Sequence, residues 1–396
     1  MKTRPLAVYV IVAAVFGAGG ARGLAVPLYA DHIGASHAVV GLLFTTFTIS
    51  GAVLSLPSGV IADRFGRGQS VILSVAIAAL SHVGAGLTSN LAVLFATQAL
   101  GGLCAGVTQT VAMAALVDEV PIHQMGRAMG WFTLAMQLGF LAGPALAGIL
   151  LGILHSNYSL VILLTALPFS LAFALSLTSV SRRMPAEVRR LELVGPLRSL
   201  WQQPGFLALL VGLLAATMLW GTYQAYIPLV GKRVFGLAPA QIGYLLALQS
   251  IANGASRVPA GRLTDRVKRK GPLVALTLAG FAAGQLVLAH LTGFWAPALL
   301  LIVTVPLIAT GFVAIGVVFA QIAPREGRGV AMGVYSTVLY LGLGLGPALF
   351  AALMDRSFSL GFTASALLGF AFALIMVFSR PRPLRRRAPL TAPPTP

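Results

Sequence analysis

A charged stretch occurs twice in this chain, and its two copies lie 202 residues apart. The first copy, PSGVIADRFGR, runs from Pro57 to Arg67, and the second, PAGRLTDRVKR, runs from Pro259 to Arg269. The chemistry that each copy offers is ion pairing, because an aspartate stands beside arginines within a short segment. Since the offset is about half of the 396 residues, we interpret the chain as a duplication whose halves each carry one charged loop.

Two arginines lie inside apolar segments, where a charged side chain is costly and usually functional. Arg22 stands about 16 residues into the first segment. Three interpretations are open for Arg22: it binds an anionic group of a substrate, it takes part in a gating ion pair, or it extends to the outer interface. Asp31 is too far along the same helix for a simple pair, at about 13 Å. Arg257 lies about five residues from the end of its segment, and for it we favour extension to the interface.

No group of residues predicts catalysis or metal binding. The six histidines are scattered, and Cys104 is the single cysteine, so no disulfide can form within the chain. We find no nucleophile–base pair, no phosphate-binding loop and no cluster of metal ligands. We therefore expect no enzymatic activity, no cofactor and no metal.

The elements that must position these residues are membrane helices. The chain is 58% hydrophobic and 9% charged, whereas soluble domains carry about 25% charged residues. Apolar segments of about 20 residues recur, each long enough to cross a bilayer as a helix. We predict about twelve helices, over residues 6–30, 37–62, 69–89, 91–117, 126–152, 158–180, 205–230, 240–262, 272–291, 295–320, 328–353 and 359–379.

The basic charge predicts an orientation in the membrane. The net charge is +18, and 22 of the 27 Lys and Arg residues lie at the termini or in the loops after every second predicted helix. This distribution follows the positive-inside rule, so both termini are predicted to be cytoplasmic, and nucleic-acid binding is not indicated. We predict an N-terminal six-helix bundle over 1–180, a cytoplasmic linker with a short surface helix over 181–204, a C-terminal bundle over 205–379, and a disordered cytoplasmic tail over 380–396.

The motifs resemble those of the major facilitator superfamily. Gly59-x-Ile-Ala-Asp63-Arg64-x-Gly66-Arg67 resembles the signature loop between helices 2 and 3 of that family, although Gly68 replaces its usual basic residue. The resemblance covers residues 5–380. It implies an all-α membrane protein with 12 transmembrane helices in two pseudo-symmetric six-helix bundles, working by alternating access.

The resemblance also implies a gate on the cytoplasmic side. Asp63 is expected beside the start of helix 11 of the other half, and Arg67 is expected to pair with Asp118 at the end of helix 4. The alternative is that these charges only set the topology. In the second copy Lys268 replaces the loop glycine, so we expect a weaker latch there. The candidate gating residues in the two loops are Gly59, Asp63, Arg64, Gly66, Arg67, Asp118, Asp265, Arg266 and Arg269.

A glycine motif on helix 5 is similar to one found mostly in exporters and antiporters of this family. Gly139, Gly143, Pro144 and Gly148 form it, and small residues at this spacing allow close helix approach. Ordinary glycine packing is the alternative. A second copy at Gly342-x-x-x-Gly346-Pro347 favours a structural hinge in both halves and weakens the motif as a marker of antiport.

By the same resemblance, helices 1, 4, 7 and 10 line a central cavity. Helix 7 carries an aromatic and polar run there, which forms either an interface belt or a stacking wall for an amphiphilic substrate. The glutamines are either interhelical hydrogen-bonding groups or ligands. The candidate substrate-binding residues are Arg22, Gln109, Gln137, Trp220, Tyr223, Gln224, Tyr226 and Gln249.

Proton coupling is left open by the acidic residues. Drug–proton antiporters of the family carry an arginine on helix 4 where this chain has Gln98. No Asp or Glu lies deep within a predicted helix, although coupling needs a titratable group that alternates its exposure. The remaining candidates are Asp31, Asp118, Glu119 and His82.

These observations predict a monomeric secondary transporter of the bacterial cytoplasmic membrane. Its leading predicted function is efflux of a small amphiphilic or drug-like compound, with protons as a candidate coupling ion. One alternative is an organic-anion carrier or exchanger that uses Arg22. An alternative of another class is a non-transporting membrane receptor or assembly partner, which the paired loops and glycine hinges disfavour.

Overall fold

The computed structural model describes residues 5–55, 57–58, 62, 65–120, 124–179, 194–203, 205–322 and 328–378. The predicted tail over 380–396 and the first part of the predicted linker, 181–193, lie outside these residues. All regular elements in the described ranges are helices. They are α1 (Pro5–His32), α2 (His37–Ser55), α4 (Arg67–Leu87), α5 (Leu91–Glu119), α6 (Met125–Ile153), α7 (Tyr158–Leu164), α8 (Ala166–Ser179), α9 (Val194–Trp201), α10 (Phe206–Arg233), α11 (Pro239–Arg266), α12 (Lys270–Leu288), α13 (Trp295–Ile322), α14 (Arg328–Arg356) and α15 (Phe358–Phe378).

The predicted membrane fold is confirmed. Within the described residues, 11 helical segments are long and apolar enough to cross a membrane. The remaining long helix, α11, has 28 residues but carries the polar residues Asn253, Arg257 and Arg262. With α11 included, the segments match the twelve predicted helices. The short helix α9 falls within the predicted linker.

Two predicted helices differ most from the structure, and a proline follows closely after each difference. The predicted helix over 158–180 is divided between Leu164 and Ala166. Pro168 favours a break, because a proline clashes with the carbonyl four residues before it, here that of Leu164. The predicted helix over 37–62 ends at Ser55, two residues before Pro57.

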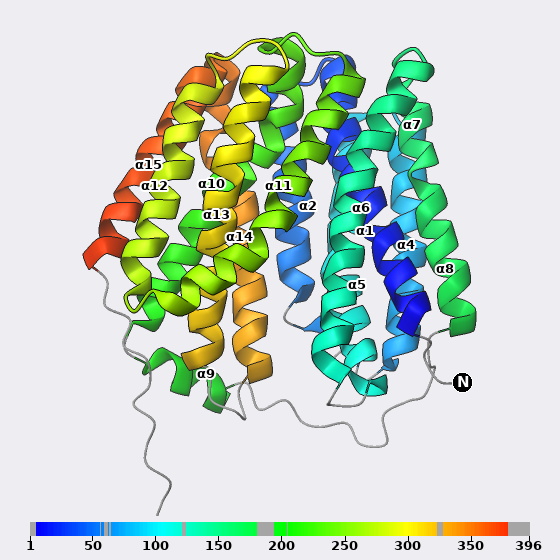
Figure 1. Cartoon of the computed structure of the whole chain (residues 1–396). Helices are drawn as coiled ribbons and strands as arrows, with labels where there is room; N and C mark the ends of the chain where they lie inside the picture. The colour runs from blue at the N-terminus through cyan, green and yellow to red at the C-terminus, as the bar shows by residue number, and fades with distance from the viewer. Residues whose placement is uncertain are drawn as a thin grey trace, which may run out of the picture.

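The helices form two bundles (Figure 1). In the first bundle, α1 packs on α6 and α8, and α5 packs on α2 and α4. In the second, α10 packs on α14, and α12 packs on α13 and α15. The bundles meet where α2 contacts α14 and where α6 contacts α11. These two contacts are equivalent under the sequence repeat, as a two-fold axis between the halves requires.

The bundles approach each other at one end of the molecule and stand apart at the other (Figure 1). We call the end where α1 finishes, at the top of Figure 1, the upper face, and the end where α1 begins the lower face. At the upper face, Gly34 and Gly236 have φ angles of 88° and 69°. These left-handed turns, 202 residues apart in the sequence, favour glycine.

The predicted glycine motif of α6 divides its contacts between the two bundles. Gly139 and Gly143 pack against the α1 backbone around Gly17. Gly148 instead packs against Pro239 and Gly243 of α11, and the carbonyl of Pro144 lies beside Gly243. In the second copy, Gly342 and Gly346 pack against α10 at Thr217 and Met218. The motif therefore serves close packing within each half, and Gly148 adds a contact between halves.

We expect Gly143→Ala to destabilise the fold by about 1–3 kcal/mol, because a Cβ at this position would overlap the carbonyl oxygen of Gly17. Thermal unfolding of the purified protein measures the change. Gly130→Ala on the same helix is the matched control, since a Cβ there would meet no atom within 4 Å. Equal melting temperatures for the two variants would contradict the proposed packing role.

Candidate functional site

Arg22 lies inside the first bundle, where its guanidinium faces α5 and α2. The residue is 4% exposed. Its Nη2 donates to the carbonyl of Thr97 at 3.1 Å, and its Cζ lies 5.1 Å from the ring centroid of Phe47. Gly101 provides the space, because a Cβ there would overlap the guanidinium. Arg22 thus points into the protein, so extension to the outer interface does not describe it.

Several hydrogen-bond donors around Arg22 are left without acceptors. The Nε and Nη1 atoms of Arg22 and the Nε2 atom of Gln98 are buried and have no partner among the described residues. Asp31, the acid on the same helix, is bound elsewhere. Buried donors without acceptors are costly, and a bound anion would satisfy the two nitrogens of Arg22.

A second polar contact of the first bundle involves His82 of α4. Its Nδ1 lies 2.7 Å from the hydroxyl oxygen of Thr165, at the break between α7 and α8. The imidazole packs edge-on against Phe169, with ring centroids 4.7 Å apart. Sequence reasoning singled out His82 but could not identify Thr165 as its partner.

The second bundle holds a neutral hydrogen-bonded network. The hydroxyl of Tyr223 donates to Oε1 of Gln249 at 2.5 Å, and Nε2 of Gln249 donates to Oε1 of Gln224 at 3.0 Å. Trp220 packs beside Tyr223, with centroids 5.3 Å apart, and beside Phe281. Tyr223 is buried, so in this conformation its ring offers no free surface to a ligand.

The other predicted binding residues lie where the bundles meet. Tyr226 is buried against Gly41 of α2, and its hydroxyl donates to the carbonyl of Pro347 at 3.3 Å. Tyr340 of α14 donates to Oε1 of Gln109 of α5 at 3.0 Å, which joins the bundles. The amide of Gln137 lies beside Gly254 of α11. The eight predicted residues therefore occupy three regions rather than one pocket.

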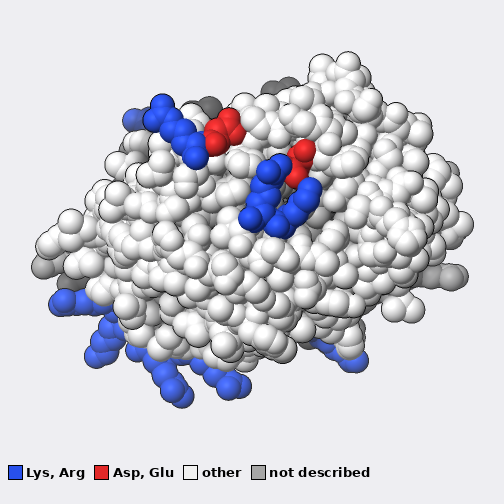
Figure 2. Space-filling model, turned by 90° about the horizontal axis from the view of Figure 1, so that it is seen from above, with Lys and Arg blue, Asp and Glu red and all other residues white. Residues whose placement is uncertain are grey.

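An ion-paired group joins the bundles at the upper face. Asp31 of α1 accepts from Lys232 at 2.8 Å and from Arg233 at 2.5 Å, both at the end of α10. Its carboxylate side chain is 1% exposed. Charged side chains are few on this face, and one group of basic and acidic residues lies near its middle (Figure 2). Sequence reasoning missed this group.

The repeat contained a signal for this ion pair. Asp31 and Arg233 are 202 residues apart, which is the offset of the charged loops. Residues at equivalent positions of two halves related by a two-fold axis can meet on that axis. The offset could therefore have indicated the pair.

The predicted lower gate is described only in part. Gly59, Asp63 and Arg64, and the side chain of Asp118, lie outside the described residues. Gly66 precedes α4 with a φ of 85°, so it occupies a conformation that favours glycine. Arg67 begins that helix and is half-buried.

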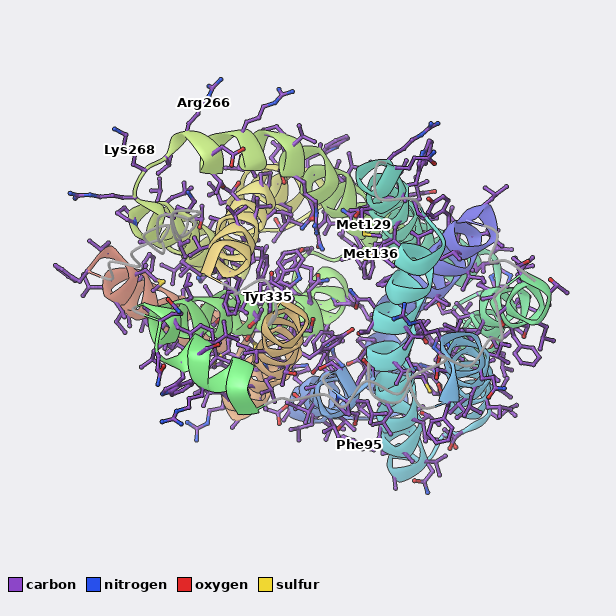
Figure 3. All side chains as sticks on the ribbon, turned by 90° about the horizontal axis from the view of Figure 1, so that it is seen from below. Phe95, Met129, Met136, Arg266, Lys268 and Tyr335 are labelled. Carbon is purple, nitrogen blue, oxygen red and sulfur yellow. The ribbon has the colours of Figure 1, made fainter. Side chains whose placement is uncertain are left out.

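The second charged loop differs from the first. Lys268, which replaces the loop glycine, has no positive φ. Asp265, Arg266 and Arg269 are exposed, and Arg266 and Lys268 point away from the bundle (Figure 3). Among the described residues, no ion pair joins this loop to the other half.

Flexible and aromatic side chains face the space between the bundles toward the lower face. Met129 and Met136 of α6 and Tyr335 of α14 lie around this space (Figure 3). All three are partly exposed. Tyr335 also packs edge-on against Phe319, with centroids 5.5 Å apart. A ligand entering from the lower face would meet these side chains.

Comparisons with known proteins agree with this architecture. A sequence model of the Major Facilitator Superfamily matches residues 8–238 and 232–395. Multidrug resistance protein 2 of Bacillus subtilis is 24% identical over 359 residues, covering 87% of this chain and 88% of that protein. Quinolone resistance protein NorA of Staphylococcus aureus is 25% identical over 129 residues, 33% of each chain.

Solved structures show the same fold at low sequence identity. The nucleoside transporter NupG superposes with a TM-score of 0.77 at 11% identity, covering 94% of this chain and 98% of that one. A bacterial homolog of the human lysosomal transporter Spinster, in an inward-facing and unoccupied conformation, gives 0.73 at 16% identity, with 94% of each chain covered.

Proposed function

Because this chain belongs to the Major Facilitator Superfamily, we propose that it is an exporter of small amphiphilic compounds that works by alternating access. The observation that carries the proposal is the lining of the space between the bundles. Met129 and Met136 face it from one bundle and Tyr335 from the other (Figure 3). Thioether side chains adapt to differently shaped apolar ligands, and an aromatic ring provides a stacking surface.

The similarity to multidrug resistance protein 2 and to NorA supports efflux, because both names refer to drug resistance. The charge distribution supports an orientation with the lower face in the cytoplasm, since the Lys and Arg residues concentrate there. In this orientation the substrate would enter from the cytoplasm. We further propose that the protein works as a monomer in the bacterial cytoplasmic membrane.

The contacts between bundles support a gating role for the upper face. Asp31 holds Lys232 and Arg233 across the interface, and the backbone N–H of Ala38 donates to Asp355 at 2.8 Å. The carbonyl of Met354 lies 3.1 Å from Nδ1 of His37. These contacts close the upper face and must break when the transporter opens to the other side.

Reconstitution of the full chain in liposomes tests the proposal. We expect several chemically unrelated amphiphilic fluorophores to cross faster than in protein-free liposomes, and to compete with one another. An imposed pH gradient should accelerate this flux if protons are the coupling ion. Folded protein that moves no compound of this class, and that shows one pattern of cysteine accessibility under all conditions, would favour the non-transporting receptor instead.

A second candidate function is transport of an organic anion. The observation that favours it is Arg22, whose Nε and Nη1 have no partner in the described part of the chain. Arg22→Gln separates the two candidates, because it should abolish anion flux and leave the flux of uncharged amphiphiles unchanged.

A further inference from the structure

Arg257 lies on the face of α11 that is turned toward the other bundle. Ser250 of α11 donates to the carbonyl of Phe140 of α6 at 3.1 Å, and Gly254 lies beside Gln137 of α6. Arg257 follows these residues by seven and three positions, so the helical period places it on the same face. Ile251 and Val258 directly follow Ser250 and Arg257 in the sequence, so they lie about 100° around the helix from them. Both are exposed apolar side chains, which suit contact with lipid.

The surroundings of Arg257 include residues from α14 as well as α11. Its Nε donates to Oδ1 of Asn253 at 3.3 Å, and it lies within electrostatic range of Tyr335. Tyr335 stands across the space between the bundles from Met129 and Met136 (Figure 3). Arg257 is exposed. Its guanidinium is therefore accessible from the space that a substrate would enter.

No carboxylate neutralises Arg257 in the part of the chain that the structure describes. Arg22 adds a second positive charge without an acidic partner among the described residues. An uncompensated cation in a low-dielectric space attracts anions and repels cations. Arg257 thus gives the space beside it a positive charge, whereas the charge of Arg22 lies inside the first bundle.

We propose that Arg257 binds the negative charge of the cargo, so that the exported amphiphile carries a single anionic group such as a carboxylate or a sulfonate. This inference rests on the proposed function and specifies its substrate class. Met129, Met136 and Tyr335 contact the apolar body of the cargo, while Arg257 selects its charge.

Three probes with the same apolar body test the inference: 1-pyrenebutyrate, 1-pyrenebutanol and the corresponding pyrenebutyl trimethylammonium cation. Binding to the purified full chain is followed by tryptophan fluorescence, and flux is followed in proteoliposomes. We expect the carboxylate to bind about tenfold more tightly than the alcohol, and the cation to bind most weakly. Arg257→Gln should remove the preference for the carboxylate without changing alcohol binding, and Arg257→Lys should keep most of it.

Arg262→Gln is the matched control, because Arg262 is an exposed arginine on the same helix, five residues nearer its end. It should leave all three affinities unchanged. Preferential binding of the cation by the natural protein, or an unchanged carboxylate preference in folded Arg257→Gln, would overturn the inference. If the alcohol or the cation is transported and the carboxylate is not, the inference fails and export stands. If none of the probes is bound or moved, both fail.

Discussion

Asp31→Asn is expected to shift the protein away from the conformation described here and to open its upper face. The carboxylate of Asp31 accepts three hydrogen bonds from Lys232 and Arg233. Charge-assisted bonds contribute about 1.5–3 kcal/mol each when buried. The basic side chains are 36% and 52% exposed, so solvent screening reduces the sum. A net loss of about 1–3 kcal/mol would change the ratio of the two conformations by roughly 5- to 150-fold.

The measurement is the labelling rate of a cysteine at Ala30, which is fully buried here, in a Cys104→Ser background. Labelling should accelerate in Asp31→Asn, and transport should slow because the closed upper face is populated less often. Arg356→Gln is the control, since Arg356 is an exposed cation near the same face. Exchanging the charges, with Asp31→Arg and Arg233→Asp together, should restore slow labelling. An unchanged rate in Asp31→Asn would exclude the gating role.

The sequence predicted the helices well because each span needs about 20 apolar residues, and few other structures satisfy that constraint. Even α11, with its arginines, was predicted over 240–262 as one of the recurring apolar segments. The break at Thr165 was not predicted. The nearby Pro168 does not predict a break by itself, because many membrane helices continue through a proline. Only the packing around His82 and Thr165 distinguishes this broken helix from a continuous one.

Side-chain partners were harder to predict than helices. Asp31 was compared only with Arg22 on its own helix, although its partners lie on the equivalent helix of the other half. The run from Trp220 to Tyr226 was predicted to face one environment. In the structure Tyr223 turns toward Phe281 and Gln249, while Tyr226 turns toward Gly41 and Pro347. The helical period places Tyr223 and Tyr226 on different faces of α10, but only the tertiary packing shows which residues each side chain contacts.

Arg22→Met is expected to stabilise the fold and to reduce transport of an anionic substrate. The prediction is specific because stability and transport should change in opposite directions. Arg22 is buried with one hydrogen bond, to Thr97, and two of its nitrogens lack partners among the described residues. Replacing such a charge by an apolar side chain of similar volume removes a desolvation penalty. By analogy with buried ion pairs, the gain is about 1–4 kcal/mol. Met also retains the packing of the aliphatic stem.

The melting temperature and the anion flux of Arg22→Met, measured on the same preparation, test both expected changes together. If Arg22 serves only the structure, its replacement should lower the melting temperature, and transport per folded molecule should not change. If it serves an anionic substrate, the melting temperature should rise while anion flux falls by at least about tenfold. Arg22→Lys keeps the charge and should retain part of the flux. A lower melting temperature with unchanged flux in Arg22→Met would contradict a functional role. That result would mean that Arg22 stabilises the fold and that transport does not need its charge.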